Sequence, residues 1–141
     1  MRVLILVLVL VPALPLLTAA QEPAASIHGH WRSPGGNSII AVAPCGDKLC
    51  GTVAWASDRA KKDAAKTTNQ LVGTQILTDL QQDKKGRWQG KLFIPDKNMR
   101  VRAKIQVING QQLKVSGCVA GKSLCKSGLW TRTGETPPAS D

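Results

Sequence analysis

Residues 99–108 read MRVRAKIQVI, residues 109–110 read NG and residues 112–117 read QLKVSG. From Met99 to Val107, apolar residues alternate with charged or polar ones, which is the pattern of a half-buried antiparallel strand. The Asn109-Gly110 pair that follows is the strongest short signal for a β-hairpin turn. In the returning run, Leu113 and Val115 fall on one face. The stretch therefore predicts a β-hairpin with one apolar face.

Turn residues divide the rest of the chain into further short runs of strand type. Residues 71–80 fit a strand or a helix, and we assign them as a strand. Residues 57–70 are rich in Lys and Ala without an apolar stripe, which predicts a polar loop or a short helix. The expected strands are 29–32, 38–43, 51–56, 71–80, 87–94, 99–108, 112–117 and 128–133.

Eight consecutive strands joined mainly by tight turns predict an all-β fold, a single small antiparallel barrel over residues 21–134. Closing the sheet on itself removes its exposed edges. At this strand number the interior is either filled by side chains or holds one small ligand, and the sequence leaves both possibilities open. Residues 135–141, which contain Pro137-Pro138, are expected to form a flexible tail.

The first twenty residues have the layout of a secretory signal peptide. Arg2 gives a short positive region, an apolar run begins at Val3, and Thr18-Ala19-Ala20 supplies small residues at the expected cleavage point. The apolar run is too short and too interrupted by proline for a transmembrane anchor. We therefore expect cleavage near Ala20 and a periplasmic or secreted protein without a transmembrane anchor.

Four cysteines in a small exported chain indicate two disulfides. Three pairings are possible; we favour Cys45–Cys50 and Cys118–Cys125 because each pair is local and brackets a turn. Loops this short contribute about 2 kcal/mol each in the chain-entropy model. The alternative is a four-thiolate zinc site, but the second pair is spaced more widely than zinc motifs usually are. We expect no metal and no cofactor.

The chain carries 19 Lys and Arg against 9 Asp and Glu, a net charge of +10, which favours anionic partners. Nucleic acid is not expected, because the protein is exported and its aromatic residues form no base-stacking pattern. Lysine and arginine on the polar side of residues 99–108 and on the preceding strand form either a solvated outer surface or a patch for an anionic ligand. The candidate patch residues are Arg87, Lys91, Arg100, Arg102 and Lys104.

No group of residues in this sequence is recognisable as a catalytic site. His28 and His30 stand two positions apart, which suits an exposed strand better than half a metal site. Carboxylates are few and scattered, and zinc-protease, phosphate-loop and serine-hydrolase motifs are absent. We therefore expect no catalytic residues and do not expect an enzyme.

Several motifs resemble the bacterial domain of unknown function 2147. These are Gly29-x-Trp31, the run APCGDKLCGTVAW at 43–55, Trp88-x-Gly90, LKVSGC at 113–118, LCK at 124–126 and WTR at 130–132. Residues 58–73 lack the Asp/Asn-Pro motif and paired arginines usual in that family. The resemblance implies a small exported protein with a lipocalin-like barrel. By similarity to calycin-type barrels, it also implies structural roles for Trp31 and Arg132, with the guanidinium stacked on the indole.

Together these features predict a non-enzymatic binding module for a small amphipathic, lipid-like or anionic ligand of the bacterial envelope. Its interior ligand contacts would include Val101, Ile105 and Leu113. The alternative is an exported protein-interaction or inhibitor protein that presents loops on a rigid barrel to an envelope protein. An enzyme is the third and least favoured class.

Overall fold

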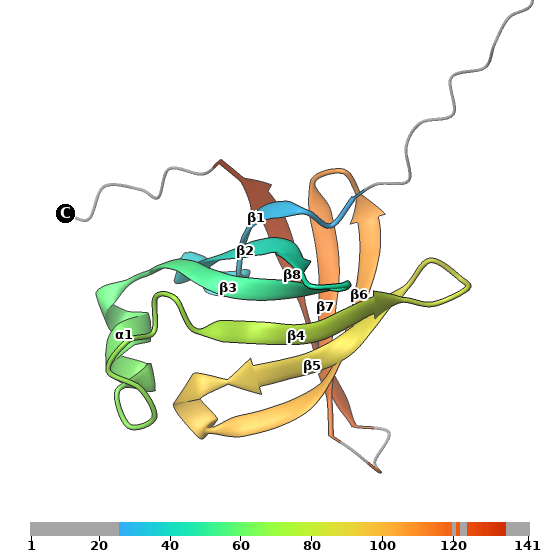
Figure 1. Cartoon of the computed structure of the whole chain (residues 1–141). Helices are drawn as coiled ribbons and strands as arrows, with labels where there is room; N and C mark the ends of the chain where they lie inside the picture. The colour runs from blue at the N-terminus through green and yellow to red at the C-terminus, as the bar shows by residue number, and fades with distance from the viewer. Residues whose placement is uncertain (1–25, 120, 122–123, 135–141) are drawn as a thin grey trace, which may run out of the picture.

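The computed structural model describes residues 26–119, 121 and 124–134, and shows a closed barrel of eight antiparallel strands (Figure 1). Each strand pairs with the next one in the chain, and β8 pairs with β1. The eight-stranded antiparallel barrel expected from the sequence is thereby confirmed. The strands are β1 (Gly29–Arg32), β2 (Ser38–Cys45), β3 (Lys48–Ala56), β4 (Gln75–Gln82), β5 (Trp88–Ile94), β6 (Met99–Asn109), β7 (Gln112–Cys118) and β8 (Cys125–Thr133).

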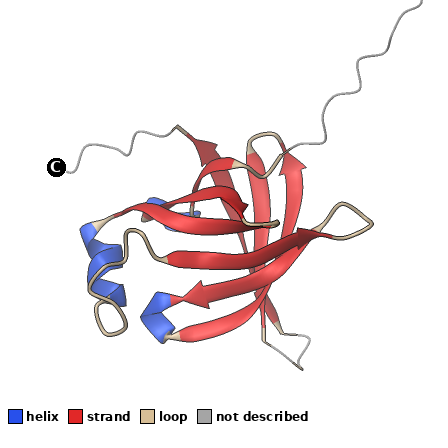
Figure 2. Ribbon diagram, in the orientation of Figure 1, coloured by secondary structure: helices blue, strands red, loops and turns tan. Residues whose placement is uncertain are grey.

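Three short helical segments occupy connections at one end of the barrel (Figure 2). They are η1 (Pro34–Gly36) between β1 and β2, α1 (Asp58–Ala64) between β3 and β4, and η2 (Pro95–Lys97) between β5 and β6. The β7–β8 connection lies at the same end, which we call the helical end. The tight turns after β2, β4 and β6 lie at the opposite end, the turn end.

Most expected strands agree with the structure to within a few residues, and the polar segment at 57–70 contains the short helix α1. Its first turn is capped by Ser57, whose Oγ accepts a hydrogen bond from the Ala60 N–H at 3.1 Å. The expectation of a strand from residue 71 is wrong for residues 71–74, since β4 begins at Gln75. Gly73 has a φ of +92° and forms a turn there, and its N–H donates to Val53 O at 2.8 Å. The last strand starts at Cys125, three residues earlier than expected.

Side chains fill the barrel interior over most of its length. The largest fully buried ones come from the inward positions of several strands and from the segment before β1. Gly51 of β3 is part of this packing, because a Cβ there would come within 2.9 Å of the Leu77 side chain. The filled region is built by Ile27, Trp31, Ile40, Leu77, Leu80, Ile105 and Leu113.

Both expected disulfides are present. Cys45–Cys50 spans the β2–β3 turn with Cα atoms 5.5 Å apart, and Cys118–Cys125 joins the ends of β7 and β8 with Cα atoms 4.1 Å apart. The pairing assigned from sequence is confirmed, and these cysteines are not available as zinc ligands.

The signal peptide expected at residues 1–20 and the tail expected at 135–141 lie outside the described residues. Within the described part of the chain, no helix is long and apolar enough to cross a membrane.

Arg132 and Trp31 pack together where β1 meets β8. The guanidinium carbon lies 4.2 Å from the centre of the indole ring. Arg132 donates to Gly110 O at 2.7 Å, to His28 O at 2.8 Å and to Ser26 O at 2.9 Å, while the Trp31 indole N–H donates to Ile27 O at 2.8 Å. These contacts join the segment before β1 to the β6–β7 turn and so help to close the turn end of the barrel.

Candidate functional site

An apolar cleft of about 420 Å³ opens at the helical end of the barrel. Its walls are the last residues of β5 and β7, the first residues of β6 and β8, and η1. We call this cleft the mouth. Its main apolar lining consists of Leu92, Ile94, Met99, Val101, Val115 and Trp130.

Strand register explains why apolar side chains line the mouth. Leu92 pairs with Val101 and Ile94 with Met99, so the inward positions of β5 and β6 form one wall. Gly128 lies on the opposite wall, where a Cβ would come within 2.6 Å of Pro34 Cγ. The missing side chain at Gly128 therefore allows η1 to pack directly on β8 and become part of the cleft.

Two lysines stand at this apolar cleft. Lys126 occupies β8 two residues before Gly128 and four before Trp130, so the period-two alternation of the strand places it on the inner wall. Lys97 lies in η2, and both lysines line the mouth. Neither forms an ion pair with any carboxylate of the described residues.

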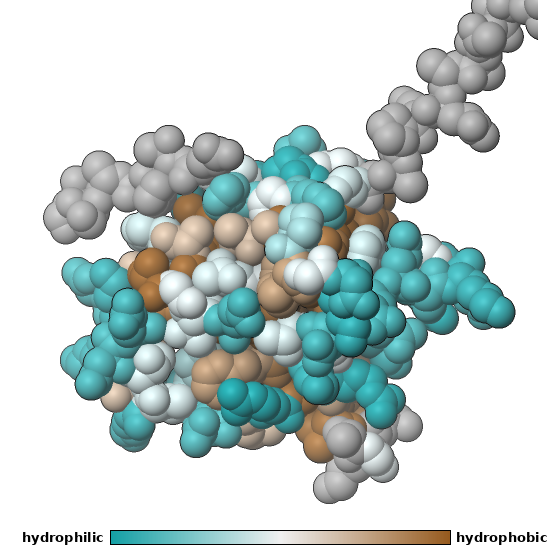
Figure 3. Space-filling model, viewed as in Figure 1, coloured by the Kyte–Doolittle hydropathy of each residue, from teal (hydrophilic) through white to brown (hydrophobic). Residues whose placement is uncertain are grey.

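Exposed apolar side chains continue outward from the mouth. Leu124 is 66% exposed, Met99 40% and Val119 37%, and all three line the cleft. Figure 3 shows apolar surface near the lower ends of β7 and β8, with hydrophilic side chains beside it. An exposed apolar rim beside lysines is the surface that an amphipathic ligand would contact.

The three interior residues named from the sequence occupy different environments. Val101 lines the mouth, whereas Ile105 and Leu113 are each 1% exposed and belong to the packed core. The sequence interpretation missed Lys126 and Lys97. For Lys126 a usable signal was present, since counting back by twos from Trp130 places it on the inner face.

The five basic residues expected to form an anionic patch do not form one continuous patch on the outer wall. Lys91 and Arg102 face each other across β5 and β6, and Lys91 forms an ion pair with Asp79 at 2.9 Å. Arg100 stacks over Phe93 at 4.5 Å. The other two residues of the expected patch are Arg87, which lies at the β4–β5 turn, and Lys104, which lies on β6.

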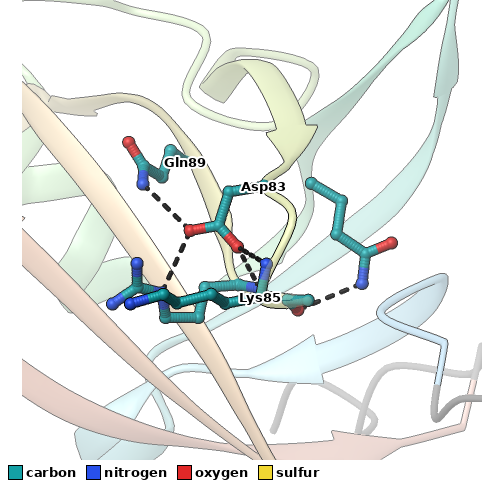
Figure 4. Close-up of polar contacts among 6 residues, drawn as sticks. Asp83, Lys85 and Gln89 are labelled. Atoms are coloured by element: carbon teal, nitrogen blue, oxygen red, sulfur yellow. Dashed lines mark hydrogen bonds and ion pairs between the residues drawn. The ribbon is translucent and has the colours of Figure 1, made fainter.

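Asp83 organises the β4–β5 turn (Figure 4). Its carboxylate accepts hydrogen bonds from the backbone N–H groups of Lys85 and Arg87, each at 2.9 Å. It also accepts from Arg87 Nε at 3.0 Å and from Gln89 Nε2 at 3.3 Å. Four donors on one carboxylate fix the turn and orient both side chains.

Hydrogen bonding and nearby positive charge lower the pKa of two partly exposed carboxyl groups, those of Asp79 and Asp83. The backbone N–H of Arg87 is the main cause at Asp83, and the hydrogen bond from the Lys91 ammonium is the main cause at Asp79. A carboxyl group whose pKa is lower in the folded state stabilises the fold at pH values above its unfolded pKa. That stabilisation is lost as the pH falls through the folded pKa.

We therefore expect Asp79 and Asp83 to titrate below 3.8, the ordinary value, in the folded protein. Carboxyl-carbon NMR shifts followed from neutral to acid pH measure this directly, and an Asp83→Asn variant assigns the Asp83 signal. Stability measured in parallel should begin to fall as the pH drops toward 3.8 and continue to fall below it. Titration of both groups at or above 3.8 would contradict the hydrogen bonds described above.

The histidines do not form a metal site with other described residues. His28 precedes β1 and is exposed, and its backbone carbonyl accepts from Arg132. His30 lies on β1. Within the described residues, no group of three or more His, Cys, Asp or Glu side chains is arranged to hold a metal ion.

Comparison with known proteins finds one family. Residues 29–132 match the family described as "Uncharacterized protein conserved in bacteria (DUF2147)". The match begins with β1 and ends within β8, so it covers all eight strands and the mouth. Neither the curated proteins nor the solved structures contain a match.

Proposed function

We propose that this chain, which belongs to the uncharacterised bacterial family DUF2147, is a non-enzymatic binding protein for a small amphipathic anion. The ligand's hydrocarbon part lies in the mouth, and its carboxylate or phosphate group lies against Lys126 and Lys97. The observation that carries the proposal is the position of Lys126. It is a lysine on an inner wall that is otherwise apolar at this end of the barrel.

The size and chemistry of the mouth suit such a ligand. Small-molecule sites commonly enclose about 300–1,000 Å³ and combine an apolar lining with a few polar groups that fix orientation. Each methylene buried in the mouth contributes about 0.8 kcal/mol. An ammonium group near the end of this lining pairs with an anionic head and selects against an uncharged one.

The source of the ligand follows from the expected location of the protein. The signal-peptide pattern at residues 1–20 and the two disulfides support export to the periplasm or beyond. Amphipathic anions in that compartment include fatty acids and the products of envelope lipids. The protein would bind one such molecule and hold its apolar part away from water.

Fatty-acid binding tests this proposal. Laurate and lauryl alcohol have the same hydrocarbon chain and differ in the charged head, and Trp130 in the mouth provides a fluorescence signal. We expect saturable binding of laurate. Lys126→Gln should weaken laurate binding by about tenfold, which corresponds to the loss of one charge-assisted contact. The same variant should leave the affinity for lauryl alcohol nearly unchanged.

Two further variants separate the mouth from the rest of the surface. Val101→Phe fills the mouth and should abolish binding of both ligands, whereas Ile108→Phe enlarges a side chain that is 46% exposed outside the mouth and should not. Lys84→Gln removes one exposed charge from the β4–β5 turn and serves as the charge control. Equal losses from Lys126→Gln and Lys84→Gln, or no saturable binding, would refute the proposal.

A further inference from the structure

A second cavity lies in a corner of the outer wall at the turn end of the barrel. The β5–β6 ladder ends where Trp88 pairs with Ile105, but β6 continues along β7 as far as Asn109. The β4–β5 turn projects away from the barrel at this point (Figure 1). Side chains from the β4–β5 turn and from β5, β6 and β7 enclose a cavity of about 230 Å³. It shares no lining residue with the mouth.

Three basic side chains line this cavity. Arg87 comes from the turn, Lys104 from β6 and Lys114 from β7. Lys104 pairs with Ser116, and Lys114 is two residues from Ser116 on the same strand, so the two lysines are diagonal neighbours on the outer face. Among the described residues, no Asp or Glu lines the cavity, and neither lysine forms an ion pair.

Hydrogen bonds orient three of the side chains that line the cavity, those of Arg87, Gln89 and Ser116, before any ligand arrives. Asp83 accepts from Arg87 Nε and from the Gln89 side chain (Figure 4). Arg87 and Gln89 both line the cavity. The terminal guanidinium nitrogens of Arg87 make no hydrogen bond to any described residue, so their N–H groups are free to donate to a ligand. On the opposite wall, the Ser116 hydroxyl lies 2.7 Å from the Ser127 hydroxyl. Four hydrogen bonds hold Asp83 itself in place.

The geometry points to a binding site for a phosphate group or a similar tetrahedral oxyanion in this cavity. Such an anion carries several acceptor oxygens that point in different directions, which matches one guanidinium and two ammonium groups supplied from different walls. The site is independent of the mouth. The same chemistry accommodates free phosphate, a soluble phosphate monoester or the phosphate of a lipid headgroup.

Titration with inorganic phosphate at constant ionic strength, followed by amide NMR shifts, tests the site. We expect saturable shifts confined to the cavity. The double variant Lys104→Gln with Lys114→Gln should weaken binding by at least about tenfold. Arg102→Gln is the control for charge outside the cavity, because it removes one of the exposed charges on the same strand and face, and it should weaken phosphate binding by about twofold or less. Non-saturable shifts, or an equal loss in the Arg102 variant, would overturn the assignment.

The Asp83→Asn variant distinguishes two roles of Asp83 near the phosphate site, because one role predicts weaker phosphate binding and the other predicts tighter binding. If Asp83 positions Arg87 and Gln89, replacing its carboxylate with an amide should weaken phosphate binding by about threefold or more, despite the loss of a negative charge. If Asp83 were only a nearby repelling charge, the same change would strengthen binding. Tighter binding would overturn the positioning role. The double-lysine variant changes only exposed side chains and tests the site even where Asp83→Asn fails to fold.

Glycerol phosphate and vesicles containing phosphatidic acid distinguish the sources of the phosphate group. If the natural ligand is a soluble monoester, glycerol phosphate should bind at least as tightly as inorganic phosphate and the vesicles should not sediment the protein. If it is a lipid headgroup, the protein should sediment with the vesicles, and the double-lysine variant should not. Laurate binding by Lys104→Gln with Lys114→Gln should stay at the wild-type level, so a failure of this site is distinguishable from a failure of the mouth.

Discussion

Replacing Arg132 with alanine is expected to lower the free energy of unfolding by about 3 kcal/mol. The guanidinium donates three hydrogen bonds to carbonyl oxygens, at Gly110, His28 and Ser26. In a part-exposed setting each such bond contributes about 1 kcal/mol or somewhat less. Stacking over the Trp31 ring adds about 0.5–1 kcal/mol.

Arg132→Lys should recover only a small part of this loss. A lysine keeps the positive charge, but its compact ammonium does not reproduce three donors arranged on one plane. We expect a loss of about 2 kcal/mol for this variant. If the charge alone mattered, lysine would restore nearly all of the stability.

Guanidinium chloride unfolding measures both variants under non-reducing conditions that keep the two disulfides intact. Arg102→Ala is the control, because Arg102 is exposed on the outer wall and makes no ion pair with any described residue. Hydrogen exchange gives a second measurement, since the amides of β1 should lose protection first when the segment before it is released. Equal stability of the Arg132→Ala and Arg102→Ala proteins would show that the closure of the turn end does not depend on Arg132.

The barrel was predictable from the sequence because its signals are local. Alternation from Met99 to Val107 fixes which face of β6 is buried, and Asn109-Gly110 fixes the turn into β7. The disulfide pairing was predictable for the same reason, since each pair joins cysteines on neighbouring strands. Local patterns suffice in this fold because every strand pairs with its neighbour in the chain and only the β1–β8 contact is distant.

The mouth was not predictable, because it depends on how far side chains fill the two ends of the barrel. Ile105 and Val101 occupy equivalent positions in the alternation of β6, yet one is in the packed core and the other lines the cleft. The difference arises from residues that are distant in sequence, such as Pro34, which packs on Gly128. Strand alternation identifies the inward face but does not show where packing stops.

The basic patch illustrates a second limit. Alternation places Arg100, Arg102 and Lys104 on one outer face, and the structure shows them there. Their partners come from other strands: Arg100 stacks over Phe93 of β5, and Lys114 of β7 joins Lys104 in the cavity. A surface charge becomes part of a site only through such cross-strand neighbours, and one strand's sequence does not reveal them.

Replacing Gly90 with alanine is expected to destabilise the protein by about 2–3 kcal/mol, although the change adds only one methyl group. Gly90 takes an inward position on β5, opposite Ala103, which is fully buried. A Cβ at this position would lie 2.5 Å from Thr78 O and 2.8 Å from Leu80 Cδ2. The nearer atom belongs to the backbone of β4, so a rotamer change does not relieve the contact.

The backbone of β4 approaches Gly90 because the strand is irregular at this point. The β4–β5 register shifts between Thr78 and Gln81, and Asp79 has a φ of +54° within that shift. The irregularity also brings the Asp79 carboxylate to Lys91, at 2.9 Å, and toward Lys48, at 3.9 Å. An alanine at position 90 would have to displace this segment, and with it these ion pairs.

Gly110→Ala is the matched control, because a Cβ there has no other atom within 4 Å. Alanine in place of an unhindered glycine usually stabilises slightly, by about 0.4–1 kcal/mol, since it restricts the unfolded chain. Chemical unfolding should therefore separate the two variants by about 3 kcal/mol, and amide shifts in the Gly90 variant should change mainly along β4. If both variants had the same stability, the close approach of β4 to Gly90 would be refuted, and so would the reason for a glycine at that position in the Trp88-x-Gly90 motif.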